Sequence, residues 1–530
     1  MCIRDRWSAE DILFVSNYGV EEDRRISIAH FTEDKASGDL PVLKVLGWDG
    51  DDTNLHLDHV ADQLTERLRW PDSPSDADAW RRQWSSAFDV GHREVITTSK
   101  GLAVRLAQLA RDTRRKALAA LEIENERGPL RTLMAAFKES LVHDLDADGF
   151  ADMYAQTIAY GLLSARVSRQ SGGLVADNMA ELVPVTNPFL KELLETFLHM
   201  GGRRKNGRNG SGIDFDELGV NEVVQVLRDA NMEAVLRDFG DKNPQEDPVI
   251  HFYELFLKEY DAKKRTQRGV FYTPRPVVSY IVRSVHELLR TEFGLEDGLA
   301  DTATWGDMAA RHEDLKIPEG VSPGQDFVQI LDPATGTGTF LVEAIDVIHK
   351  TLAGKWKGQG HGQAGVDALW NEYVPKHLLT RLHGYELLLA PSAIAHLKVG
   401  LKLHETGYRV GSNERVRVYL TNALEPAQDN VQQVLAGTLP ALAHEAAAVN
   451  EVKAKQRFTV VIGNPPYAYE SANRGEHIAR LIAPYYTIEG VALRERNPRG
   501  LQDDFVKFVR FAEAVLTTTQ KGVFGYITNN

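Results

Sequence analysis

The sequence predicts an α/β fold in which a doubly wound parallel sheet occupies residues 265–530. Two observations predict this sheet. From about residue 265, short apolar runs alternate with stretches in which apolar residues recur at helical spacing. Polar or glycine-rich residues directly follow several of the apolar runs. Ahead of the sheet we expect a helical domain over 126–264 and a small α/β region over 1–125, whose role the sequence does not indicate.

The elements of the first two parts follow from hydrophobic periodicity. In the N-terminal part, β-rich apolar runs predict strands over 11–19 and 41–48, and helical spacing extends from 77 to 120. In the helical part, apolar residues lie three and four positions apart. This pattern predicts helices over 130–145, 151–167 and 249–265.

The C-terminal part reads as strands and helices in alternation. Prolines are favoured in the first turn of a helix, so Pro274 and Pro276 predict a helix start there. A glycine- and glutamine-rich stretch, 357–365, predicts an insertion loop. The expected strands are 327–331, 381–387, 415–420, 457–463 and 522–527, and the expected helices are 339–352, 391–403 and 503–516.

The composition excludes several classes of protein. Of 530 residues, 43% are hydrophobic and 26% are charged, as in soluble globular proteins. A net charge of −14 argues against a chain coated with nucleic-acid-binding charge. No apolar run approaches the length of a membrane span, no secretory leader is visible, and Cys2 is the only cysteine. We therefore expect a bacterial cytoplasmic protein with no membrane partner, no disulfide framework and no cysteine-based metal site.

A glycine-rich loop, 332–341, follows the first strand of the sheet and opens a helix. Gly336 and Gly338 let the backbone turn tightly and approach a ligand without a clash from a Cβ atom. The amides at the helix start favour an anionic group, and Asp332 can take a cationic amine. A ligand that carries both is amino-acid-like. A phosphate loop would need a lysine that this stretch lacks.

Three further positions have two interpretations each. Glu386 ends the second strand, where an acidic residue binds ribose hydroxyls in doubly wound folds, or it is an exposed strand-end glutamate. Asn422 follows the third strand and either binds an adenine edge or serves as a turn residue. Tyr272 and Thr273 precede the helix at Pro274 and either close over a cofactor or cap that helix.

The stretch VVIGNPPY, Val460 to Tyr467, is the most specific motif of the chain. Pro465 and Pro466 cannot continue a ladder of backbone hydrogen bonds, so they make a stiff turn at the strand end. Such a turn holds the amide of Asn464 and one carbonyl in place beside the flat face of Tyr467. The arrangement suits a planar substrate with an exocyclic amine, such as adenine. The alternative is a proline-rich turn after a buried strand.

With these motifs in this order, the sequence resembles the amino-methyltransferases that use S-adenosylmethionine. The closest match is the gamma-ordered DNA adenine-N6 methyltransferases, whose sheet is Rossmann-like. The segment 150–167 also resembles the type ISP restriction-modification polypeptides and related phage-defence methylases. The resemblance covers about 140–530. It rests on YTP, DPATGTGTFL, GYE, NAL, NPPY and GVFGYITNN.

The resemblance implies a role for each motif. The loop would hold the methionine part of the cofactor, Glu386 would bind its ribose, and the segment before Pro274 would close the methionine end. The NPPY turn would accept hydrogen bonds from the target amine, and its aromatic ring would stack on the base. Asn422 departs from the acidic residue that is frequent there. The cofactor residues are Tyr272, Thr273, Asp332, Thr335, Gly336, Gly338, Glu386 and Asn422, and the catalytic residues are Asn464, Pro465, Pro466 and Tyr467.

The resemblance also implies a function: transfer of a methyl group from S-adenosylmethionine to the N6 amine of a flipped-out adenine in double-stranded DNA. No metal is required. Restriction or defence-system subunits are the expected further partners. Three alternatives stay open: a methyltransferase for protein glutamine or RNA guanine, a non-catalytic subunit that binds the cofactor or DNA, and a fragment that is inactive in isolation.

The fragment hypothesis rests on the two ends of the chain. The sequence stops just after the fifth expected strand, where this fold adds two more, so we expect a C-terminally incomplete sheet and a recognition domain beyond Asn530. An unpaired edge strand is prone to aggregate. The start, MCIRDR, resembles a leader that recurs in assembled environmental sequence, so we expect Cys2 not to be native.

Overall fold

The structure, a computed structural model, describes most of the second half of the chain and parts of the first. The described residues are 11–18, 25–32, 42–49, 96–124, 126, 128–140, 145–168, 187–200, 218–232, 234–235, 248–260, 273–409, 414–427, 440–467, 471, 473–493 and 498–528. They divide into two compact units. One unit comprises 1–96 with 229–231, and the other comprises 97–228 with 232–530.

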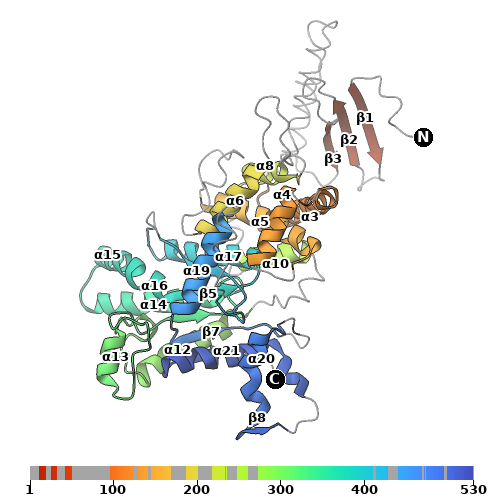
Figure 1. Ribbon diagram of the computed structural model, residues 1–530. Helices are drawn as coiled ribbons and strands as arrows, with labels where there is room; N and C mark the ends of the chain where they lie inside the picture. Colours follow the sequence, from red (N-terminus) through yellow and green to blue (C-terminus); the bar gives the residue numbers. More distant parts are fainter. Residues whose placement is uncertain are drawn as a thin grey trace. The chain divides into compact units, whose positions relative to one another are not determined.

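The first unit contains a three-stranded antiparallel sheet (Figure 1). Its strands are β1 (Asp11–Tyr18), β2 (Arg25–Thr32) and β3 (Val42–Asp49), in that order. The two predicted strands, 11–19 and 41–48, are confirmed. Strand β2 was not predicted, although its apolar residues Ile26, Ile28 and Phe31 are typical of a strand. The first part of the predicted helical stretch, 77–95, lies outside the described residues.

Helices form the first part of the second unit. The predicted helices over 130–145, 151–167 and 249–265 are confirmed as α4, α5 and α10, within the residues that are described. Helix α3 packs against both α5 and α10, and α5 in turn packs against α17 (Leu389–Glu405) of the sheet region. The helices are α3 (Ser99–Ile123), α4 (Pro129–Ser140), α5 (Ala147–Ser168), α6 (Pro188–Met200), α8 (Val220–Asp229) and α10 (Pro248–Tyr260). The predicted domain boundaries stay a prediction.

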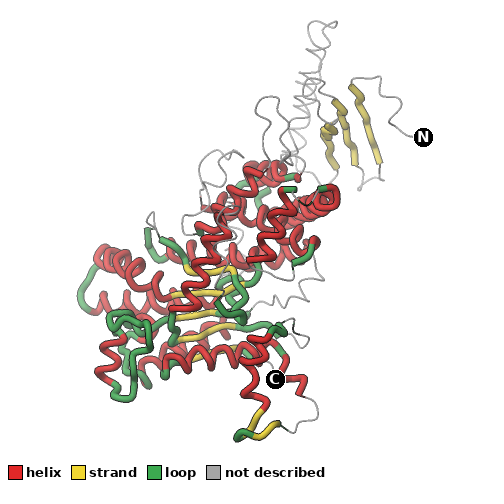
Figure 2. The backbone as a smooth tube through the Cα atoms, viewed as in Figure 1, coloured by secondary structure: helices red, strands yellow, loops and turns green. Residues whose placement is uncertain are grey.

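A five-stranded parallel sheet forms the centre of the second part (Figure 2). Its strand order is β10-β7-β4-β5-β6, and all four strand pairs are parallel. The α/β fold with a parallel sheet is therefore confirmed, and each predicted strand overlaps one that is observed. The strands are β4 (Ile330–Asp332), β5 (Leu382–Glu386), β6 (Arg417–Leu420), β7 (Val460–Gly463) and β10 (Val523–Tyr526).

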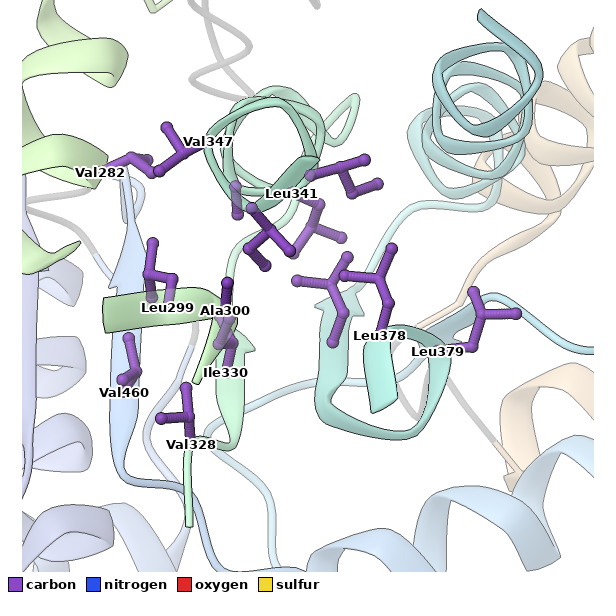
Figure 3. Packing of buried hydrophobic residues seen from close by; sticks show 14 of the residues in the cluster. Val282, Leu299, Ala300, Val328, Ile330, Leu341, Val347, Leu378, Leu379 and Val460 are labelled. Carbon is purple, nitrogen blue, oxygen red and sulfur yellow. The ribbon is translucent and has the colours of Figure 1, made fainter. Parts of the chain in front are cut away.

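Hydrophobic side chains cover both faces of this sheet. Successive strand residues point to opposite faces, and the neighbours Ile330 and Leu331 belong to two different apolar clusters. The cluster of Ile330 includes residues of α12 (Arg275–Thr291), α14 (Thr339–Gly358) and α17 (Leu389–Glu405). Figure 3 shows Val282, Leu341 and Val347 of this cluster over the strands.

The cluster of Leu331 on the opposite face includes residues of three later helices. They are α19 (Pro440–Lys455), α20 (Glu476–Ile482) and α21 (Asp504–Thr519). The remaining elements are α13 (Trp305–Arg311), α15 (Gln363–Tyr373), α16 (Leu379–Arg381), the hairpin β8 (Thr487–Ile488) and β9 (Val491–Ala492), a π-turn at Val374–Leu378 and 3₁₀ turns at Gly298–Ala300, Ala483–Tyr486 and Pro498–Gln502.

Two predictions about local structure meet different outcomes. The predicted helix start at Pro274 and Pro276 is confirmed, because Pro274 is the N-cap of α12 and Pro276 lies in its first turn. The predicted insertion loop over 357–365 is wrong for most of its length. Helix α14 continues to Gly358 and α15 begins at Gln363, so the connection is a short turn. Within the described residues, no helix is both long and apolar enough to cross a membrane.

Candidate active site

The predicted site residues that are described gather at the carboxyl ends of four neighbouring strands. Asp332 ends β4 and Glu386 ends β5, while Asn422 and Asn464 follow β6 and β7. The strand order reverses at β4, because β5 and β6 extend the sheet on one side and β7 and β10 on the other. Ligands of open α/β sheets bind at such a switch point. Tyr272 lies outside the described residues.

The glycine-rich loop is held against the ends of β4 and β5. The amide of Thr335 donates to the carbonyl of Tyr385 at 3.0 Å, and its hydroxyl donates to the carbonyl of Asp332 at 2.9 Å. Gly336 and Gly338 have φ angles of +55° and +79°, which side chains disfavour. Gly338 is the N-cap of α14 and has no side chain that would block the helix amides. The loop therefore presents backbone donors at the start of a helix.

Asp332 is a buried carboxylate with one free oxygen. Its Oδ1 accepts a hydrogen bond from the amide of Ala334 at 3.1 Å, whereas Oδ2 has no partner among the described residues. Burial and, to a smaller extent, the nearby charge of Glu386 raise the pKa of Asp332 to about 8, although the amide of Ala334 lowers it. A buried carboxylate of this kind is stabilised by a cationic partner.

Glu386 connects β5 to the glycine-rich loop. Its Oε2 accepts from the amide of Gly336 and its Oε1 from the amide of Leu388, both at 2.8 Å. Burial raises the pKa of Glu386 to about 7, although these amides lower it. Glu386 is therefore not an exposed strand-end residue. A carboxylate has about four acceptor positions, so Glu386 can also accept a hydrogen bond from a hydroxyl of a ligand.

Two strand glycines make room for these side chains, and sequence reasoning missed both. A Cβ atom on Gly463 would lie 2.8 Å from Oδ1 of Asp332, and one on Gly384 would lie 2.4 Å from Oγ1 of Thr335. Glycine inside a strand pattern is itself a signal of close approach. Both glycines were visible in the sequence as members of HGYE and VIGNPPY.

Tyr526 of β10 is a further polar residue near Asp332. Its hydroxyl is buried and has no hydrogen-bond partner in the described part of the chain. Burial, together with the charge of Asp332, raises its pKa well above the usual value. Tyr526 pairs in register with Gly463, so its position in the sheet is next to the end of β7.

The NPPY turn brings Asn464 between two hydroxyl groups. The Nδ2 of Asn464 donates to Oγ1 of Thr273 at 3.0 Å, and its Oδ1 accepts from the hydroxyl of Tyr467 at 2.8 Å. Pro465 is buried, whereas Asn464, Pro466 and Tyr467 are half-buried. Burial raises the pKa of Tyr467. The turn thus presents a polar amide and an aromatic side chain beside the end of β7.

The side chain of Asn422 is used within the protein. Its Oδ1 accepts from the amide of Leu424 at 3.0 Å, and its Nδ2 donates to Oδ1 of Asn473 at 2.9 Å. The half-buried Lys453 donates to the carbonyl groups of Asn422 and Glu425 at 2.7 and 2.8 Å. Burial lowers the pKa of Lys453 to about 8. These contacts agree with the interpretation of Asn422 as a turn residue, and its contact with an adenine stays a prediction.

A buried polar network fixes the segment after the NPPY turn, and sequence reasoning missed it. The Nζ of Lys507 donates to Oγ of Ser471 at 2.6 Å and to the carbonyl of Asn473 at 2.8 Å. Asp504 accepts from the Ser471 hydroxyl and from Nδ2 of Asn473. Because Asn473 also contacts Asn422, the network connects the start of the loop after β6 to the segment after the NPPY turn and to α21. The sequence feature that could have indicated this network is the Asp–Lys pair, three residues apart, in an otherwise apolar helix.

The described residues contain no group of three or more histidine, cysteine, aspartate or glutamate side chains that could hold a metal ion. The groups in the site are instead carboxylates, backbone amides, one asparagine amide and aromatic rings. Their chemistry is hydrogen bonding, charge pairing and stacking.

Comparisons with known proteins identify the C-terminal part. Residues 392–530 match the family model of the Eco57I restriction-modification methylase. The chain is also similar to the cryo-EM structure of the DrdV–DNA complex, with a TM-score of 0.53 and 21% identity, over 86% of this chain and 38% of that chain. A second similar structure is the ATP-dependent Type ISP restriction-modification enzyme LlaBIII bound to DNA, with a TM-score of 0.51 and 18% identity, over 90% of this chain and 29% of that one.

This chain therefore spans less than two fifths of either structure. At these identities the two structures support the fold, and no curated protein matches the chain. The family match covers most of α17 and all of β6, β7 and β10, and it includes the whole NPPY turn. The predicted resemblance to restriction-modification methyltransferases is confirmed: residues 392–530 match the family model of the Eco57I restriction-modification methylase, and the two structures share the fold.

Proposed function

We propose that this chain transfers a methyl group from S-adenosylmethionine to the N6 amine of adenine in double-stranded DNA, within a restriction-modification or phage-defence system. One observation carries the proposal. The half-buried amide of Asn464 holds a hydroxyl donor on its oxygen at the switch point of the sheet, next to the strand that ends in Asp332. An amine donor fits the same oxygen.

The residues around the glycine-rich loop fit the cofactor. The free Oδ2 of Asp332 suits the ammonium of a methionine group, and the start of α14 suits its carboxylate. Glu386 suits a pair of ribose hydroxyls. When bound, S-adenosylmethionine supplies an electrophilic methyl group on a sulfonium. Because these residues fit the cofactor, we assign the sheet to the doubly wound, Rossmann-like class. In this assignment Thr335, Gly336 and Gly338 contact the methionine part of the cofactor. Tyr272 and Thr273 close that end, and Asn422 lies near the adenine of the cofactor.

The NPPY residues would activate the target. The amine of adenine is a poor nucleophile because its lone pair is delocalised into the ring. Two acceptors, Oδ1 of Asn464 and the carbonyl of Pro465, would take the two N–H groups and keep the lone pair on the nitrogen. Positioning of this kind supplies much of the rate of such reactions. Pro466 stiffens the turn that holds both acceptors.

The base must leave the double helix to reach these acceptors. Stacking on Tyr467 would offset part of the unstacking cost, since base–aromatic stacking is worth about 1–3 kcal/mol. The similar DrdV and LlaBIII structures are both DNA complexes, which supports DNA as the partner. Further subunits of a restriction or defence system are the other proposed partners.

The proposal is tested by incubating the full chain with methyl-labelled S-adenosylmethionine and duplex DNA. A duplex with a mismatched adenine lowers the cost of base extrusion. Mass spectrometry of the hydrolysed DNA is expected to find N6-methyladenine. Parallel reactions contain RNA or a glutamine-containing peptide in place of the duplex. Label that appears only on N2 of guanine in the RNA, or on a glutamine amide in the peptide, would instead support the rival substrate classes. The absence of cofactor binding would argue against the enzyme altogether.

A further inference from the structure

We propose that Thr273 is a positioning residue for Asn464, because it satisfies the amide nitrogen while the amide oxygen faces the target amine. This inference rests on the proposed function and assigns the hydroxyl of Thr273 a role of its own, in addition to the proposed closing of the cofactor site by the segment before Pro274. It also differs from the helix cap that the sequence left open. The N-cap of α12 is Pro274, and no side chain caps that helix.

The geometry places the two residues together across the fold. They lie 191 positions apart in the sequence, and Nδ2 of Asn464 reaches Oγ1 of Thr273 at 3.0 Å. Pro274 follows Thr273 directly and restricts its backbone, while Pro465 and Pro466 restrict the backbone after Asn464. Both partners are therefore held on stiff segments, so the contact joins the start of α12 to the end of β7.

An asparagine amide has two ends of similar shape and opposite polarity. A half-turn of the side chain would present N–H groups to the target, which itself offers only N–H groups on its amine. That arrangement removes one of the two proposed acceptors. A partner that accepts a hydrogen bond from the nitrogen stabilises the productive orientation, and the hydroxyl of Thr273 is that partner.

The second hydroxyl beside Asn464, that of Tyr467, has a different role in the proposed reaction. Tyr467 donates to Oδ1 of Asn464 at 2.8 Å, the atom that the target amine would use. The tyrosine hydroxyl can pair with either end of the amide, whereas an amine that donates can pair only with the oxygen. The hydroxyl of Tyr467 therefore leaves Oδ1 when the base arrives, and the hydroxyl of Thr273 stays in place.

The test compares Thr273→Val with Thr273→Ser in the full chain. Valine keeps the shape and removes the hydroxyl, and we expect kcat for methyl transfer to fall about tenfold, as for one lost hydrogen bond. The Kd of S-adenosylmethionine, measured by calorimetry, stays within about twofold of the wild-type value. Serine restores kcat. Thr304→Val, which removes a capping hydroxyl at α13, controls for a general loss of stability.

Three results would overturn the proposal. An unchanged kcat in Thr273→Val would show that the hydroxyl does not act on the amide. A large rise in the Kd of the cofactor would return Thr273 to the cofactor site. A loss in Thr273→Ser equal to that in Thr273→Val would indicate packing rather than a hydrogen bond.

A second measurement separates this proposal from the proposed function. If the wild-type chain methylates no adenine, the proposed function fails, but the contact between Thr273 and Asn464 remains testable by thermal unfolding. Contacting residues have non-additive effects. We expect Thr273→Val to lower the melting temperature less in the Asn464→Ala background than in the wild type. Equal decreases in both backgrounds would show that the two side chains do not interact.

Discussion

Gly463, the last residue of β7, leaves the space that the carboxylate of Asp332 occupies: a Cβ atom on Gly463 would lie 2.8 Å from Oδ1. The same glycine immediately precedes Asn464. Because Gly463 has no side chain, the carboxylate of Asp332, which we propose binds the cofactor, and the amide of Asn464, which we propose is catalytic, can lie at the ends of adjacent strands. The proposed cofactor site and the proposed target site therefore meet at this point of the sheet.

This contact predicts that Gly463→Ala weakens cofactor binding. The added methyl group forces Asp332 out of place, and overpacking of this kind costs about 1–3 kcal/mol. We expect the Kd of S-adenosylmethionine to rise roughly tenfold by calorimetry. The matched control is Gly400→Ala in α17, where a Cβ atom would meet nothing within 4 Å. Equal Kd values for the two variants would show that the Gly463 contact has no effect on the site.

The raised pKa values of Asp332 and Glu386 predict that the stability of the free chain depends on pH. These carboxyls, with pKa values of about 8 and about 7, bind protons more tightly in the folded than in the unfolded chain. Their contribution to stability is therefore fully present below about pH 4 and is lost as the pH rises toward 8. Urea unfolding between pH 5 and 8 measures this slope, and Asp332→Asn is expected to reduce it. A slope that Asp332→Asn leaves unchanged would contradict the assignment.

The raised pKa of Asp332 also predicts that binding of the cofactor releases protons. An ammonium group favours the charged form of Asp332, so its binding lowers the pKa of that carboxyl. We expect calorimetry at pH 7 in buffers of different ionisation enthalpy to detect net proton release. We also expect affinity to increase from pH 6 to pH 8. Affinity that does not change over this range would argue against a cation at Asp332.

Glu386→Gln tests the bridge between β5 and the glycine-rich loop. Glutamine has one acceptor oxygen, so its NH₂ group would face either the amide of Gly336 or that of Leu388. Loss of a hydrogen bond to a charged group costs about 1.5–3 kcal/mol. We expect the Kd of the cofactor to rise by about ten- to a hundredfold. A Kd close to that of the wild type would remove Glu386 from the proposed site.

We expect substitution of Lys507 to lower the stability of the chain strongly. Its side chain is fully buried, and the Lys507→Met variant would leave Asp504 as a buried charge without its cation. Breaking a buried pair in this way costs about 3–5 kcal/mol. We expect a large fall in the urea midpoint, which Asp504→Asn in the same chain partly restores. A midpoint that stays at the wild-type value would show that the network does not hold the segment after the NPPY turn.

Local patterns were sufficient to predict much of the sheet. Each strand of the parallel sheet is an apolar run, and the glycine-rich loop and the NPPY turn follow their strands directly. Asp332, Glu386 and Asn464 were therefore each predicted at the end of a strand. The prediction of a loop over 357–365 was wrong because its glycine-rich composition was taken to end the preceding helix. In the structure α14 accommodates both Gly354 and Gly358.

Contacts that depend on tertiary packing were not predictable in the same way. The pair of Thr273 and Asn464 joins residues 191 positions apart, and no local pattern indicates it. The network around Lys507 requires α21 to pack beside the segment after the NPPY turn. The room that Gly463 leaves for Asp332 becomes apparent only when β4 and β7 are neighbours.

The most direct test of the central claim is methyl transfer by the wild-type chain and by Asn464→Ala, measured with labelled S-adenosylmethionine and adenine-containing duplex DNA. Loss of one catalytic hydrogen-bonding group typically costs about 10²–10³ in rate. The account predicts N6-methyladenine with the wild type, a fall of at least this size in Asn464→Ala, and cofactor affinity that is nearly unchanged. Near-normal transfer by Asn464→Ala would contradict it.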